Sequence, residues 1–194
     1  MTRDATKPPD LSEWARLIVL ANAWRVFVRP LRPDDEAAVK RLLEHVTAED
    51  LRLRFFAAIK DFSHLFLTRL IHLDYAKAMA FIAFDDVTHE PLGVVRLHND
   101  PSRRSGEYAI LLRSDLKGHG LGWALMEMMI AYAKETGLAQ VRGQVLQVNT
   151  IMLTMCRELG FVVRTDPQDR NLCDVTLDLE RDALRADGRA AGLR

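Results

Sequence analysis

Residues 106–132, GEYAILLRSDLKGHGLGWALMEMMIAY, decide the fold of this chain. The stretch begins with an apolar segment, 108–112, that predicts a strand, and a basic turn with three glycines leads from it into a predicted helix. Glycine lets the backbone approach a ligand closely and adopt positive φ. Successive amide N–H groups in such a turn, followed by a helix N-terminus, form a site for an anion. We therefore expect residues 117–122 to bind a phosphate or a pyrophosphate.

Three phosphate-binding motifs can be compared with this turn. A P-loop requires GxxxxGK[ST], a string that the sequence lacks. A dinucleotide-binding fingerprint requires GxGxxG, but Trp123 stands in the place of the third glycine. The pattern that remains is a basic residue followed by two spaced glycines, Lys117-x-x-Gly120-x-Gly122. For this short pattern alone, an ordinary strand-to-helix turn is the alternative.

The composition predicts a soluble globular protein in the cytoplasm. The chain has 194 residues, of which 48% are hydrophobic, and its 27 Lys and Arg residues balance 27 Asp and Glu residues. With no net charge, attraction to nucleic acid or to an anionic membrane is not expected. Cys156 and Cys173 form no CxxC pair, and the histidines show no HxxxH spacing, so neither a metal site nor a disulfide framework is indicated. The apolar run 17–23 is too short to span a membrane.

The rest of the chain is predicted to alternate strands and helices within one domain, without a linker or an internal repeat. Residues 1–10 are expected to be disordered, and the tail after Glu180 is expected to be frayed. The predicted strands are 25–31, 78–84, 91–97, 108–112, 141–146, 161–164 and 173–179. The predicted helices are 11–23, a segment that begins at Pro33, a segment capped by Thr47, 63–73, the helix that starts at Leu121, and a helix capped by Asn149 that ends at Gly160.

This order of elements, together with two motifs, resembles the GNAT (GCN5-related N-acetyltransferase) superfamily. The turn is similar to the family's acetyl-CoA pyrophosphate loop, [R/Q]xxGx[G/A]. Asn149-x-x-Met152 and Leu159-Gly160-Phe161 match the family's asparagine-bearing helix and the strand that follows it. The resemblance implies an α/β (α+β) fold with a central mixed, mostly antiparallel sheet of about six to seven strands, flanked by about four helices.

Residues 24–179 further resemble the GNAT domain of bacterial protein lysine acetyltransferases. The similar segments include RPLRPDDEAAVKRLL, LDYAKAMAFIAF and GVVRLHNDP. We accordingly expect an N-terminal extension over residues 1–23, an acetyltransferase domain over 24–180 and a tail over 181–194. In that group the GNAT domain is often joined to an acyl-CoA-synthetase-like or nucleotide-sensing domain, and none is seen in this sequence.

The chemistry of acyl transfer to an amine indicates one candidate base. A lysine ammonium has a pKa of about 10.4, so producing the neutral amine at neutral pH costs roughly 4–5 kcal/mol. A carboxylate can accept that proton directly or through a water molecule. Glu107 begins the strand before the turn, on the sheet face of Ala109 and Leu111, and apolar neighbours there would make it a better base. The matching glutamate of the family is the general base; a solvated strand-end glutamate is the alternative.

The resemblance also implies which residues hold acetyl-CoA. The strand end is expected to pair with the pantetheine arm, the turn and the start of the helix are expected to hold the pyrophosphate, and the asparagine is placed near the pantetheine, although a plain helix cap is its alternative. His119 is expected to contact phosphate, with a solvated loop position as its alternative. The cofactor-binding residues are Leu111, Leu112, Arg113, Lys117, Gly118, His119, Gly120, Leu121, Gly122, Trp123, Asn149 and Met152.

One position departs from the family pattern. Many members have a tyrosine, four residues before the glycine that closes the later helix, as the acid that protonates the leaving thiolate, and here Cys156 takes that place. A thiol can donate a proton, but a lone cysteine on a helix face is more often a small buried hydrophobe. We therefore assign no general acid.

The predicted function is acetyl-CoA-dependent N-acetylation by direct transfer, with Glu107 as general base and no metal. A lysine side chain of a protein, such as a metabolic enzyme, is the first acceptor to be considered, and a small-molecule amine is the second. A non-catalytic module that binds acyl-CoA is the alternative from another class. The protein is expected to be a monomer or a homodimer, with no nucleic-acid or membrane partner.

Overall fold

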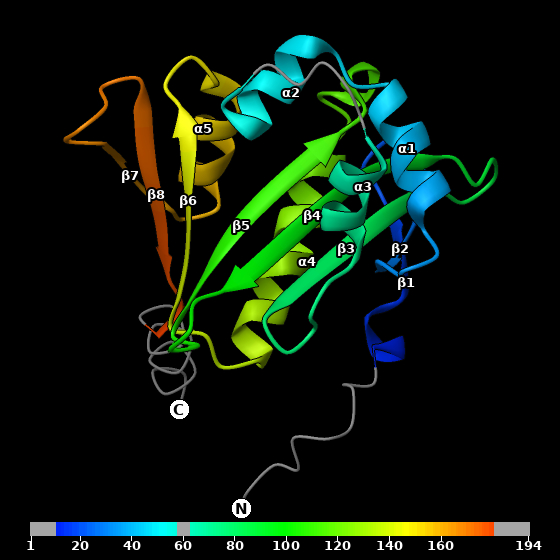
Figure 1. The fold of residues 1–194 in the computed structure, drawn as a ribbon, viewed down its shortest axis with the longest axis horizontal. Helices are drawn as coiled ribbons and strands as arrows, with labels where there is room; N and C mark the ends of the chain where they lie inside the picture. The colour runs from blue at the N-terminus through cyan, green and yellow to red at the C-terminus, as the bar shows by residue number, and fades with distance from the viewer. Residues whose placement is uncertain (1–10, 58–62, 181–194) are drawn as a thin grey trace, which may run out of the picture.

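The computed structural model describes residues 11–57 and 63–180, and its centre is one mixed sheet (Figure 1). The eight described strands follow the order β1-β2-β3-β4-β5-β6-β8-β7, and all neighbours are antiparallel except β5 and β6. The strands are β1 (Arg16–Val19), β2 (Arg25–Pro30), β3 (Ala78–Asp85), β4 (Pro91–Asn99), β5 (Ser105–Leu112), β6 (Gln140–Leu146), β7 (Val162–Thr165) and β8 (Leu172–Asp178).

Helices cover both faces of this sheet (Figure 1). Hydroxyl or amide caps begin three of them, because Thr47, Ser63 and Asn149 each accept a hydrogen bond from the backbone amide three residues later. Two short 3-10 helices, Ser12–Trp14 and Ser114–Leu116, precede β1 and follow β5. The α-helices are α1 (Glu36–Glu44), α2 (Ala48–Phe55), α3 (His64–Ile71), α4 (Leu121–Glu135) and α5 (Thr150–Glu158).

Each face of the sheet has its own hydrophobic core. On one face, Ala80 and Ile82 of β3 pack with residues of α1, α2 and α3. On the other, Phe81 and Leu97 pack with α4 and α5. Successive side chains of a strand point to opposite faces, so the continuous apolar run of β3 serves both cores. One helix layer therefore lies over each face of β3, β4 and β5.

The sheet opens between β5 and β6. These strands pair in parallel only over Ser105–Glu107 and Gln140–Arg142, whereas β6 pairs with β8 along its whole length. Figure 1 shows the two strands diverging beyond this contact. The Tyr108 ring packs directly over Gly143 and occupies the space where the strands separate. The backbone of residues 108–112 consequently faces an open cleft on the β6 side.

The expected mixed, mostly antiparallel sheet flanked by helices is confirmed, but the described residues form eight strands and five α-helices rather than about six to seven strands and about four helices. The predicted helix 11–23 is wrong. Residues 12–14 form a 3-10 turn, and β1 then pairs with β2 at the sheet edge. The Trp14 ring lies 5.7 Å from the Phe81 ring and 5.1 Å from the Tyr132 ring, so core packing and strand pairing outweigh the helical pattern.

The predictions for residues 1–10 and for the tail after Glu180 lie outside the described residues. Within the described part, no helix is both long and apolar enough to cross a bilayer.

Candidate active site

The opening between β5 and β6 is a cleft of about 480 Å³. Its walls come from α2, β4, β5, β6, α5 and the glycine-containing turn. The predicted site residues that line it are Glu107, Leu111, Leu112, Lys117, Gly122, Asn149 and Met152. The topology thus brings together residues that are up to 45 positions apart in the sequence.

The turn before α4 has the backbone shape that the glycine pattern predicts. Gly118 and Gly120 have φ of +81° and +82°, and a Cβ atom at either position would meet nothing within 4 Å. Conformation, rather than lack of space, is therefore what requires glycine there. Gly122 differs, because a Cβ on it would lie 3.2 Å from Leu112 Cδ1. Its lack of a side chain lets α4 lie close to the end of β5.

The amides of this turn are free to bind an anion. Within the described structure, no N–H of residues 117–120 donates to a backbone carbonyl, and the N-cap Gly120 provides no side-chain acceptor for α4. The helix has 15 residues and no acidic side chain in its first turn. Its positive dipole end and its unpaired donors therefore point to solvent at one end of the cleft.

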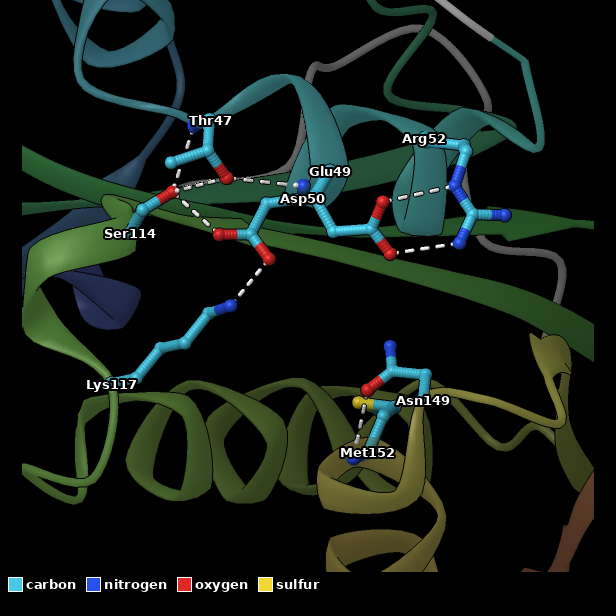
Figure 2. A network of polar contacts seen from close by, with 8 residues as sticks. All are labelled: Thr47, Glu49, Asp50, Arg52, Ser114, Lys117, Asn149 and Met152. Atoms are coloured by element: carbon cyan, nitrogen blue, oxygen red, sulfur yellow. Dashed lines mark hydrogen bonds and ion pairs between the residues drawn. The ribbon is translucent and has the colours of Figure 1, made fainter.

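Lys117 forms an ion pair within the chain. Its ammonium contacts the carboxylate of Asp50 on α2, and Ser114 Oγ donates a 2.5 Å hydrogen bond to the same carboxylate (Figure 2). Ser114 Oγ also accepts from the Thr47 amide at 2.8 Å. Burial alone would raise the pKa of Asp50, but the bonds from Lys117 and Ser114 hold it below its usual value. This network ties α2 to the turn.

Asn149 lies across the cleft from that network, at the start of α5 (Figure 2). Its Oδ1 accepts from the Met152 amide at 3.2 Å, so the predicted helix cap is present. Its side-chain nitrogen has no hydrogen-bond partner among the described residues and remains available to a ligand in the cleft. The cap and the proposed ligand contact can therefore coexist.

Glu107 lines the cleft at the point where β5 separates from β6. It is exposed, and its cross-strand neighbour on β4 is His98. The enclosed apolar surroundings expected from its strand position are not found, because the neighbouring lining residues include the basic side chains of Arg54 and Arg96. Solvent and a substrate amine can reach this carboxylate.

Two arginines that the sequence pattern did not single out line the cleft beside Glu107. Burial lowers the pKa of Arg54 to about 10, with repulsion from Arg96 adding to the effect and Glu107 opposing it. Burial also lowers the pKa of Arg96, whose guanidinium donates to the Leu70 carbonyl. Both side chains remain cations at neutral pH. The sequence could have indicated Arg96, because it is a lone charge within the apolar run of β4. Arg54 could not be singled out in this way, because charged and apolar residues alternate along α2.

Cys156 is fully buried, and its Sγ lies 3.2 Å from the Tyr108 hydroxyl. Burial raises the pKa of Cys156, and burial followed by the contact with Cys156 raises that of Tyr108. Both groups are therefore neutral at physiological pH. This environment fits the interpretation of Cys156 as a small buried hydrophobe.

Several predicted site residues do not line the cleft. Arg113 forms a bidentate pair with Asp115, at 3.1 and 2.8 Å, and Leu121 is buried in the core under α4. The His119 ring is exposed and lies edge-on to Trp24, 6.2 Å between ring centroids. Outside the cleft lining as well are Gly118, Gly120 and Trp123. Gly118, His119 and Gly120 belong to the turn, whose free backbone amides lie at one end of the cleft.

Among the residues that the structure describes, no group of three or more His, Cys, Asp or Glu side chains is placed to hold a metal ion. The described groups that border the cleft include the carboxylates of Asp50 and Glu107, the cations of Arg54, Arg96 and Lys117, and free backbone donors of the turn.

Comparison with known proteins agrees with this geometry. A solved structure of the GNAT domain of PAT from S. lividans has a TM-score of 0.80 at 23% identity, covering 89% of this chain and 99% of that domain. RimL, a ribosomal L7/L12 alpha-N-protein acetyltransferase solved in complex with coenzyme A, has a TM-score of 0.66 at 10% identity, covering 84% of this chain and 98% of its own. These similarities establish the fold.

Sequence comparison establishes the family. Acetyltransferase PA5475 of Pseudomonas aeruginosa is 30% identical over 146 residues, which make up 74% of this chain and 78% of that protein. The model of the acetyltransferase (GNAT) family matches residues 40–161, a range that contains β5, the turn, α4 and α5. The chain therefore belongs to the GNAT family of acetyltransferases, which use acetyl-CoA as acetyl donor.

Proposed function

We propose that this protein binds acetyl-CoA in the cleft between β5 and β6 and transfers the acetyl group to a lysine side chain of a protein. One observation carries the proposal: the turn before α4, whose described amides have no backbone acceptor, lies at one end of the cleft that the open edge of β5 and the carboxylate of Glu107 line. We assign the acetyltransferase domain to residues 24–180, between an N-terminal extension and a C-terminal tail. We place its activity in the cytoplasm.

The turn and α4 suit the pyrophosphate of CoA. Two phosphates can accept hydrogen bonds from the amides of residues 117–123, and the helix dipole favours their charge. Lys117 can add a cation by leaving Asp50, while His119 and Trp123 lie beside the same amides. Because the backbone supplies most of the donors, the binding does not depend on any single side chain of the turn.

The end of β5 suits the pantetheine arm. Residues 111 and 112 lie in the part of β5 that β6 leaves unpaired, and Arg113 follows directly; an extended amide chain can pair with such an edge as an added strand. Asn149 and Met152 border the cleft on the opposite side, where the amide nitrogen of Asn149 can donate to a carbonyl of the arm. The thioester then lies between β5 and β6, on the side of Glu107.

Glu107 is proposed as the general base. Its carboxylate takes a proton from the lysine ammonium, directly or through a water molecule, and the neutral nitrogen attacks the thioester carbon. The new C–N bond forms as the C–S bond breaks, and the acylated nitrogen loses its second proton to solvent. CoA leaves as a thiolate that takes a proton from solvent, and Glu107 returns its proton to solvent before the next turnover. No side chain is assigned as acid, since the thiol at the family's tyrosine position is buried against Tyr108.

The rim of the cleft supports a protein as the acceptor. Phe56, Val148 and Ile151 border the cleft and expose 47%, 67% and 69% of their surfaces. An apolar rim of this kind is covered well by a polypeptide, but extends beyond the reach of a small amine. A small-molecule amine and a non-catalytic acyl-CoA-binding role are the alternatives that an experiment must separate.

The test uses the purified protein, radiolabelled acetyl-CoA and a cell extract. The proposal expects label in protein lysines, located by mass spectrometry after digestion. If label entered only small molecules, the acceptor would be an amine metabolite and not a protein lysine. Tight binding of acetyl-CoA by calorimetry without transfer to any fraction would instead support the non-catalytic module.

A further inference from the structure

The cleft has more basic than acidic groups on the side where an acceptor amine would enter. Arg54 comes from α2 and Arg96 from β4, and both line the cleft together with Glu107. In the register of β4 and β5, Arg96 lies opposite Ala109 and His98 opposite Glu107, so the cations and the carboxylate share one sheet face. That face is covered by α1, α2 and α3, whereas the turn continues into α4 on the other face.

Neither arginine is neutralised by a carboxylate hydrogen bond among the described residues. Arg96 donates to the Leu70 carbonyl, and the Arg54 guanidinium lies 4.7 Å from the Phe55 ring centroid. Other arginines of the chain do have carboxylate partners: Arg52 binds Glu49 at 2.7 Å, and Arg29 binds Asp35 at 2.6 Å. The cleft thus keeps two guanidinium groups available to a substrate.

The charges that border the cleft leave a positive excess near Glu107. Asp50 is paired with Lys117, so among the described lining residues Arg54 and Arg96 remain against the one carboxylate of Glu107. A guanidinium held away from water is costly unless an anion pairs with it. An acceptor that presented only an ammonium group would meet two like charges beside the base. An acceptor that also carried a carboxylate would pair with them, and a planar guanidinium binds a carboxylate in bidentate fashion.

We propose that Arg54, assisted by Arg96, selects acceptors that carry a carboxylate next to the reacting amine, which for a protein substrate means a lysine beside an aspartate or glutamate. The inference deepens the proposed acetyltransferase function and rests on it. A carboxylate on the acyl donor would satisfy the same cations. We assign the carboxylate to the acceptor because both arginines line the cleft beside Glu107 on the α1–α3 face, whereas the turn that suits the donor's pyrophosphate leads into α4 on the other face.

The test compares paired lysine peptides with acetyl-CoA as donor. Each pair carries Asp or Glu on one side of the lysine in one peptide and Asn or Gln in the other. The wild-type protein is expected to show a kcat/KM roughly 10-fold or more higher for the acidic peptide. Arg54→Gln is expected to reduce this ratio to near one, mainly through KM, whereas Arg54→Lys retains much of it. Equal values for both peptides with the wild-type protein would overturn the inference while leaving acetyl transfer intact.

Arg52→Gln is the matched control. Arg52 lies on the same helix, two residues from Arg54, but pairs with Glu49 and is absent from the cleft lining. Its substitution is expected to leave the peptide ratio unchanged. If Arg52→Gln reduced the ratio as strongly as Arg54→Gln, a general effect of surface charge would explain the preference and the inference would fail. Circular dichroism melting shows whether each variant is folded, and the wild-type ratio tests the inference even if Arg54→Gln is not.

Two further measurements separate the sources of failure. Calorimetric binding of the corresponding acetyl-lysine peptides, in the presence of CoA, reports the carboxylate preference without turnover. If the wild-type protein transfers nothing but still prefers acidic product peptides, the proposed activity fails and the recognition of a carboxylate stands. If succinyl-CoA is preferred over acetyl-CoA and Arg54→Gln abolishes that preference, the carboxylate belongs to the donor and the inference is overturned.

Discussion

The two halves of the cleft differ in the groups that line them, which are backbone amides in one half and charged side chains in the other. The half at the N-terminus of α4 is made of backbone: two glycines with positive φ, unpaired amides and a helix dipole. The half under α2 is made of side chains, with Arg54, Arg96 and Glu107 brought together from separate elements. A backbone site tolerates changes of side chain but not of backbone conformation. A side-chain site responds to single changes of charge.

The largest loss of activity is expected on substitution of the side chain that contacts the reacting amine. Glu107→Gln keeps the size of the residue but removes the base, and general-base catalysis contributes about 100- to 10,000-fold. We expect kcat to fall by at least about 100-fold, while the Kd for acetyl-CoA, measured by calorimetry, stays within about twofold. Unchanged turnover in this variant would remove Glu107 from the mechanism.

In the backbone half of the cleft, CoA affinity is expected to be most sensitive to substitution of Gly120. Alanine there must adopt φ near +82°, which costs about 1–2 kcal/mol for a residue with a Cβ atom. If the turn relaxes to avoid this strain, its amides lose their common direction, and we expect the Kd for CoA to rise about tenfold. Calorimetry of CoA binding and thermal melting measure the two effects.

Gly137→Ala is the control for that variant. Gly137 follows the opposite end of α4, has φ of +77° and offers open space to a Cβ atom, so its substitution carries a similar conformational cost far from the cleft. Similar loss of stability with unchanged CoA affinity is expected. Equal loss of CoA affinity in both variants would mean that the turn has no special part in binding.

For CoA affinity, the charge of Lys117 is expected to matter less than the backbone conformation of the turn. Lys117→Ala removes the cation and leaves the amides in place, so we expect the Kd for CoA to rise only about threefold, with a weaker salt dependence. Calorimetric titrations at low and high salt measure both. An effect larger than that of Gly120→Ala would show that the side chain, rather than the backbone, dominates this half.

The smallest expected effect concerns the network that joins the two halves. Bonds from Lys117 and Ser114 hold the pKa of Asp50 below its unfolded value, so the stability they provide is present above about pH 4 and is lost as the pH falls through the folded pKa. Asp50→Asn is expected to reduce the free energy of unfolding at pH 7 by about 1 kcal/mol and to weaken its dependence on acid. Urea unfolding at pH 7 and pH 3 checks this, and parallel pH profiles for both proteins would contradict it.

The residues of the backbone half illustrate how much could be predicted from local pattern. Positive φ at Gly118 and Gly120, the cap at Asn149 and the strand-turn-helix order around residues 106–132 follow from short-range chemistry. The helix expected over residues 11–23 shows where local pattern misleads, because that segment becomes β1 by pairing with β2. Its extended form depends on a strand edge that the segment's own residues do not contain.

The amino-acid sequence was sufficient for the order of elements from residue 25 onward, for the positive φ of the glycine-containing turn and for the resemblance to an acetyltransferase family, because these depend mainly on short sequence patterns. The tertiary structure alone revealed that Arg54 has no carboxylate partner among the described residues, that Glu107 is exposed and that Lys117 pairs with Asp50. These depend on long-range contacts: Asp50 and Lys117 are 67 positions apart and meet only because α2 folds over the end of β5. Charge pairing across such separations depends on the packing of whole elements.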